Sequence, residues 1–72
     1  MTLNDLKPGE SGKVIGIGQT GNVKKRIMDM GITTGINITV VKRAPLGDPI
    51  EIKLRGYGLS IRKSEAGQIE IG

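Results

Sequence analysis

Glycine and proline interrupt this chain so often that only short helices and strands can form between them. The 72 residues include 12 glycines and 3 prolines. Glycine adopts backbone angles that other residues avoid, and proline continues neither a helix nor a central strand. Most of the intervening segments alternate apolar and polar residues, which is the period of a strand with one buried face. The sequence therefore predicts a mainly β protein.

The alternation predicts five short strands and one short helix after the first strand. The strands are expected at residues 13–18, 36–43, 50–55, 59–63 and 68–71, with a helix at 23–30 and a turn at 64–67. In the helix, Val23, Ile27 and Met30 recur at the spacing of one buried face. Asn22 is expected to cap its start, and Gly31 to end it in the left-handed conformation.

The length of the chain favours a closed arrangement of these strands. Residues 1–72 are enough for a single small domain with a thin core. An open sheet of five short strands would leave more edge than so short a chain can cover. We therefore expect a compact β-barrel of the SH3-like or OB-like type.

Composition excludes most catalytic and metal chemistry. The chain has neither cysteine nor histidine, so thiolate and imidazole ligands and the commonest acid–base side chain are missing. Its seven carboxylates are scattered, with no pair at helical ligand spacing. We expect no enzymatic activity, no cofactor and no metal site. The N-terminus lacks the pattern of a signal peptide, and no apolar run approaches the roughly 20 residues of a membrane helix, so a cytoplasmic protein is expected.

A glycine-rich motif, GIGQTG at residues 16–21, matches the fingerprint of dinucleotide-binding proteins. That fingerprint belongs to a βαβ unit with an acidic residue roughly 20 positions further on, where this chain has Val41 and Lys42. The motif is better interpreted as a flexible turn from strand to helix. A weak anion site at the helix start, near Lys24 and Lys25, stays open.

A net charge of +4 raises the question of an anionic partner such as a nucleic acid. Outward-facing basic residues of the strands could form one binding face. Proteins that bind single strands stack bases on aromatic side chains, however, and Tyr57 is the only aromatic residue here. Ordinary solvent-exposed strand positions explain the basic residues as well, so nucleic acid is kept only as an alternative partner.

The loop at residues 44–49, APLGDP, contains an apolar residue near its tip. Pro45 and Pro49 stiffen the loop, and Gly47 permits an unusual backbone angle. Leu46 could fold back over an edge of the core, or it could stay exposed and mark a contact with another protein. The local chemistry alone slightly favours the first of these interpretations.

Three segments resemble the FeoA family of bacterial ferrous-iron transport proteins. These are LKPGESGKVIGI (6–17), KKRIMDMGITTGINITVVKRAPLGDPIEI (24–52) and GLSIRKSEAGQIEI (58–71). The resemblance covers nearly the whole chain, in order and at matching spacing. It implies an SH3-like barrel and a non-enzymatic cytoplasmic accessory protein. Its implied partner is FeoB, the inner-membrane ferrous-iron transporter with a cytoplasmic GTP-binding domain. The chain would reach the membrane by binding this transporter. A free-standing regulatory module, like the SH3-like domain of iron-dependent repressors, is the second alternative.

The resemblance also shifts the interpretation of the loop toward an exposed Leu46. We expect an apolar docking surface made by Leu46, Gly47, Asp48 and Pro49 together with Met28 and Tyr57. The basic run Lys24, Lys25 and Arg26 would steer the approach to an acidic partner or an anionic membrane face.

Overall fold

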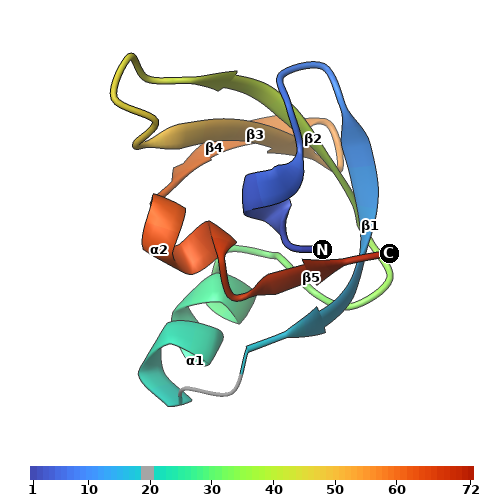
Figure 1. The fold of residues 1–72 in the computed structure, drawn as a ribbon. Helices are drawn as coiled ribbons and strands as arrows, with labels where there is room; N and C mark the ends of the chain where they lie inside the picture. Colours follow the sequence, from blue (N-terminus) through green and yellow to red (C-terminus); the bar gives the residue numbers. More distant parts are fainter. Residues whose placement is uncertain (19–20) are drawn as a thin grey trace.

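The computed structural model, which describes residues 1–18 and 21–72, is a small antiparallel β-barrel (Figure 1). Its elements are the 3₁₀ helix η1 (Leu3–Asp5), β1 (Ser11–Ile17), α1 (Gly21–Asp29), β2 (Asn37–Arg43), β3 (Ile50–Leu54), β4 (Tyr57–Ile61), α2 (Lys63–Ala66) and β5 (Ile69–Ile71). The five strands form one sheet in the order β4-β3-β2-β1-β5. The prediction of a mainly β fold with five strands and a helix after the first strand is confirmed.

The sheet curls around a core of aliphatic side chains. In β3 the predicted alternation is confirmed, since Ile50, Ile52 and Leu54 are buried and Lys53 is exposed. Figure 1 shows η1 inside the curl of the sheet, with α1 and α2 along one side. The buried apolar residues are Leu3, Leu6, Val14, Ile27, Ile32, Ile38, Val40, Ile50, Ile52, Leu54, Ile61, Ala66, Ile69 and Ile71. Within residues 1–18 and 21–72, no helix has both the length and the apolar character needed to cross a bilayer.

Two predictions about the helices are wrong in detail. Helix α1 begins at Gly21, so Asn22 lies within its first turn and does not cap it. The predicted turn at 64–67 is the short helix α2. Its first two free N–H groups are satisfied by carboxylates: Arg62 N–H donates to Glu65 Oε1 at 3.0 Å and Lys63 N–H donates to Asp48 Oδ1 at 3.0 Å. These bonds stabilise a helical turn that the sequence alone does not indicate. The motif at 16–21 includes residues 19 and 20, which lie outside the described residues.

The C-terminus of α1 follows the prediction. Gly31 has φ +89°, its N–H donates to Met28 O at 2.9 Å, and Ile32 N–H donates to Ile27 O at 3.3 Å. This pair of bonds is the Schellman motif, and Ile32 is fully buried beyond it. The Tyr57 hydroxyl donates to Met30 O at 3.0 Å, so β4 also holds this end of the helix.

Replacing Gly31 should cost more free energy of unfolding than replacing a glycine of similar φ in open space. Gly47 has φ +84° and no atom within 4 Å of the position that a Cβ would take, so Gly47→Ala should cost about 1 to 2 kcal/mol from the left-handed backbone alone. A Cβ at Gly31 would also collide with the Tyr57 hydroxyl, so Gly31→Ala should cost more. Urea unfolding of both variants measures the difference.

A double variant separates the collision from the backbone effect. In a Tyr57→Phe background the colliding hydroxyl is gone, so Gly31→Ala should then cost about as much as Gly47→Ala. An unchanged cost in this background would show that the Tyr57 contact does not constrain Gly31.

Candidate functional site

The connection between β2 and β3 is a turn that holds Leu46 in solvent. Gly47 N–H donates to Ala44 O at 2.7 Å, and Ala44 N–H donates to Pro49 O at 3.1 Å, so the loop is closed by its own backbone. Leu46 lies between these bonds and is 94% exposed. In Figure 1 the turn extends beyond the end of the sheet, at the upper left. The interpretation of Leu46 as a cover for the core is therefore wrong.

Asp48 attaches this turn to the body of the protein. Its carboxylate accepts the hydrogen bond from Lys63 N–H at the start of α2. Asp48 therefore acts as a remote cap of α2, 15 positions away in sequence, as well as standing beside Leu46. The peptide bond between Asp48 and Pro49 is cis.

A hollow of about 390 Å³ lies against the same turn. It is lined by Lys42, Arg43, Ala44, Pro45, Pro49 and Glu51. Two features of its wall are fixed: Arg43 Nη2 donates to Asn4 O at 2.7 Å and to Leu6 O at 2.9 Å, and Lys42 Nζ lies 3.7 Å from Glu51 Oε2. The exposed leucine can insert into a partner protein, and the hollow, lined in part by proline and alanine, can accept a side chain from that partner. No pattern in the sequence indicates this hollow.

The other predicted surface residues lie elsewhere. Met28 and Tyr57 are 46% and 44% exposed, and Tyr57 is bound to the C-terminal end of α1. Figure 1 shows α1 and the β2–β3 turn at opposite ends of the molecule, with α2 between them. The predicted surface is thus divided in two, with Leu46 to Pro49 at one end and the α1 residues at the other.

The basic run at the start of α1 is also divided. Lys24 and Lys25 are exposed, as predicted. Arg26 Nε lies 3.2 Å from Glu65 Oε2, whose side chain is only 8% exposed. Arg26 therefore joins α1 to α2 through an ion pair, so the predicted basic run does not consist of three equivalent residues.

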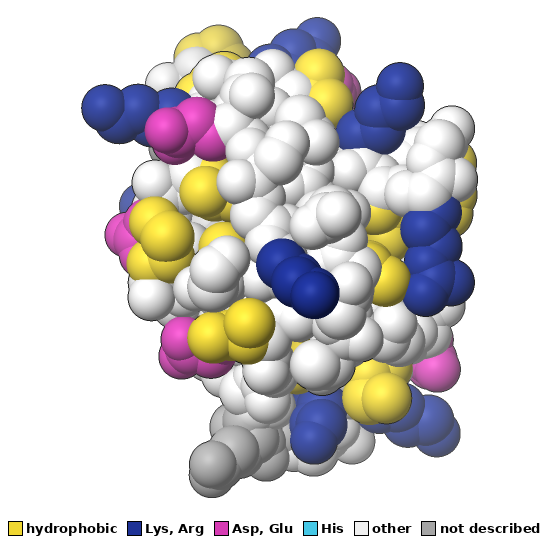
Figure 2. All heavy atoms as spheres, turned by 90° about the vertical axis from the view of Figure 1, so that its right-hand side faces the viewer, with side chains coloured by type: hydrophobic (Ala, Val, Ile, Leu, Met, Phe, Trp, Pro, Cys, Tyr) yellow, Lys and Arg dark blue, Asp and Glu magenta, His cyan; other side chains and the backbone are white. Residues whose placement is uncertain are grey.

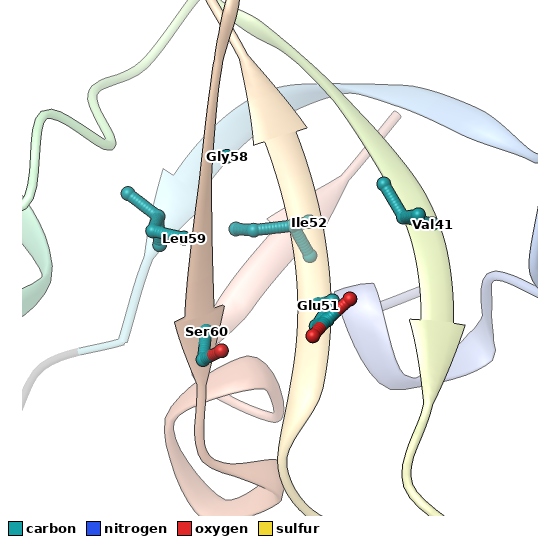
Figure 3. A pocket seen from close by; sticks show the side chains of 6 residues that line it. All are labelled: Val41, Glu51, Ile52, Gly58, Leu59 and Ser60. Atoms are coloured by element: carbon teal, nitrogen blue, oxygen red, sulfur yellow. The ribbon is translucent and has the colours of Figure 1, made fainter.

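A second hollow, of about 230 Å³, lies on the outer face of β2, β3 and β4 (Figure 3). Val41 and Glu51 stand along it, and Gly58 and Ser60 leave β4 with little side chain on this face. Figure 2 shows a different view, in which basic side chains are spread over the surface with hydrophobic and acidic ones between them. On that face no continuous basic patch of the kind that tracks a nucleic-acid backbone is visible.

The sequence matches the model of the FeoA domain over residues 1–72. The chain belongs to the FeoA family. Family membership confirms the resemblance that the three sequence segments indicated.

Two solved structures have the same fold as this FeoA-family chain. A FeoA-like protein from Clostridium acetobutylicum is 47% identical, with a TM-score of 0.94 over 100% of this chain and 84% of that one. The FeoA of Stenotrophomonas maltophilia, solved with zinc and described as an SH3 domain protein, is 24% identical, with a TM-score of 0.86 over 100% of this chain and 89% of that one. The fold is therefore SH3-like, as predicted.

A curated relative carries the same domain in a much longer chain. It is the Fe(2+) transport protein A/Fe(2+) transporter FeoB fusion protein of Porphyromonas gingivalis, 37% identical over 71 residues. The match covers 99% of this chain and 8% of that protein.

The bond between Asp48 and Lys63 gives a prediction about stability. Asp48→Ala leaves the Lys63 N–H without its acceptor and should lower the free energy of unfolding by about 1 kcal/mol. Asp48→Asn keeps a side-chain oxygen at the same place and should cost less than half of that. Urea unfolding measures both costs, and equal losses in the two variants would contradict the capping role.

Proposed function

We propose that this protein is a non-enzymatic accessory of ferrous iron uptake that docks on a FeoB-type transporter through Leu46. The observation that carries the proposal is the 94% exposure of a leucine on a turn closed by its own hydrogen bonds. Membership of the FeoA family and the relative in which a FeoA and a FeoB protein share one chain support the choice of partner. The chain would act in the cytoplasm and reach the membrane through the transporter.

Docking through Leu46 is favourable for two physical reasons. Burying an exposed leucine side chain contributes roughly 2 kcal/mol. The turn is already ordered by the bonds at Ala44 and Gly47 and by the anchor at Asp48, so little backbone entropy is lost on binding. The hollow beside the turn gives a partner side chain a place to pack next to Leu46.

Docking influences transport only where the chain binds one state of the transporter more tightly than another. Lys24 and Lys25 are on α1, which lies at the other end of the molecule from the β2–β3 turn (Figure 1). They raise the rate of encounter with an acidic surface without adding much affinity. Leu46 is thus the proposed anchor, and the basic residues are the proposed guide.

The test is binding of the purified transporter to Leu46→Asp. The variant should fold with the stability of the wild type, because the side chain touches little of the protein. It should bind the transporter at least about 30-fold more weakly, which corresponds to the roughly 2 kcal/mol of a buried leucine. Iron uptake in cells that depend on the protein should fall in parallel.

Met28→Asp is the matched control, because Met28 is an exposed apolar residue on α1. It should leave transporter binding within about twofold of the wild type, since surface substitutions away from a contact have small effects. Loss of binding in Met28→Asp together with full binding in Leu46→Asp would move the docking surface to α1. Full binding in both variants would rule out both apolar surfaces.

A further inference from the structure

The two edges of the sheet are treated differently. At one edge, the N-terminal segment lies beside β5 and covers it. Thr2 forms a bridge with Glu70, and Ile71 N–H donates to Met1 O at 2.8 Å. At the other edge, β3 is the only strand that pairs with β4 among residues 1–18 and 21–72. Figure 3 shows β4 at the rim of the sheet, with β3 and β2 on one side of it only.

The hairpin register determines which groups of β4 are free. Arg55 and Gly56, with φ +48° and +82°, form the two-residue turn between β3 and β4. The pair that closes such a turn, Leu54 and Tyr57, is hydrogen-bonded, and bonded pairs then alternate along the ladder. Gly58 and Ser60 therefore direct their backbone N–H and C=O groups away from β3. In the described part of the chain, no backbone hydrogen bond from another segment reaches them.

β4 also lacks the features that usually protect an edge. Proteins block strand addition with charged side chains, proline or bulges on the edge strand. The segment YGLSI contains neither a charged residue nor proline. Its pairing with β3 has no register shift, although the β1–β5 and β2–β3 pairings each have one. Both Gly58 and Ser60 are exposed.

The charge at the two ends of β4 indicates what could add to it. Arg55 precedes the strand, Arg62 and Lys63 follow it, and all three are exposed. Three carboxylates around β4 have partners within the protein: Glu51, opposite Ser60, pairs with Lys42, Glu65 pairs with Arg26, and Asp48 accepts from the backbone N–H of Lys63. A strand that carries acidic residues at both ends would therefore find basic partners at both ends of β4.

We propose that the open edge of β4 binds an extended segment of another protein with acidic residues at both ends, by strand addition. The backbone of that segment bonds to Gly58 and Ser60, and its acidic residues lie against Arg55 at one end and against Arg62 and Lys63 at the other. A second copy of this chain fits less well. Antiparallel pairing centred on Leu59 would place Arg55 of one copy opposite Lys63 of the other, and like charges directly opposite repel.

The outer hollow supports the same edge. On the outer face of β4, Gly58 has no side chain and Ser60 has a small one. The hollow of about 230 Å³ extends from these two residues to Val41. Figure 3 shows Gly58 and Ser60 on β4 beside this hollow, with Glu51 on β3 and Val41 on β2 further in. A side chain of an added strand can therefore lie over Gly58 and Ser60 at the near end of this hollow.

A library experiment tests the proposal without assuming a partner. The full-length protein is panned against random peptides of about ten residues, long enough to reach both charged ends. Enriched peptides should have acidic residues at both ends around a centre of β-branched residues. In NMR hydrogen exchange, the amides of Gly58 and Ser60 should become protected when such a peptide is added. The amide of Leu59, which already bonds to β3, should change little.

Variants of the edge make the test specific. Ser60→Pro removes an N–H that faces away from β3, so it should weaken the binding of an enriched peptide by about tenfold. Ser60→Ala keeps this N–H and should leave the affinity unchanged. The double charge reversal Arg55→Glu and Lys63→Glu should weaken peptide binding by a similar factor and reduce its dependence on salt concentration. Leu46→Asp should bind the peptide normally, which separates this edge from the proposed transporter contact.

Several results would overturn the proposal. These are the absence of enriched peptides, enrichment of basic or neutral ones, and exchange at Gly58 and Ser60 that does not change on binding. Formation of a β4-to-β4 dimer in solution, seen as protection of the same amides in the protein alone at high concentration, would identify a second copy as the occupant instead. The exchange measurement uses the wild-type chain, so it decides the question even where Ser60→Pro does not fold.

Discussion

Two carboxylates at the start of α2 hold the outer parts of this small barrel in place. Glu65 accepts the Arg62 N–H and pairs with Arg26, which fixes α1 against α2. Asp48 accepts the Lys63 N–H, which fixes the β2–β3 turn against the other side of the same short helix. The loop that presents Leu46 and the helix that carries Lys24 and Lys25 are therefore both tied to one turn of four residues, Lys63–Ala66. The burial of Ile27 and the bond from Tyr57 to Met30 hold the helix as well.

The core and the strands were predictable because their signal is local. In β3 the alternation shows which face of the strand is buried, namely the one with Ile50, Ile52 and Leu54. Gly31 marks the end of α1 because it takes a backbone angle that other residues avoid. The segment at 64–67 resembled a turn because one of the two carboxylates that satisfy the start of its helix, Asp48, is far away in the sequence. No periodicity reports a bond of that kind.

The candidate surface was predictable only in part. The exposure of Leu46 depends on whether the turn closes on itself, which the pattern APLGDP permits without requiring. The separation of Met28 from Leu46 depends on which side of the barrel α1 packs against, and a helical stripe states only which face is buried. Arg26 illustrates the same limit, since three adjacent basic residues look equivalent until the partner of one of them is known.

The only aromatic side chain of the protein is in contact with the end of a helix. Because the chain contains one tyrosine and neither tryptophan nor phenylalanine, its intrinsic fluorescence and near-ultraviolet circular dichroism come from Tyr57 alone. The hydroxyl of that residue donates to Met30 O at the C-terminus of α1. The natural optical signal of the protein is therefore a local one: it reports whether α1 is seated on β4, and it does so independently of the aliphatic core, which is optically silent.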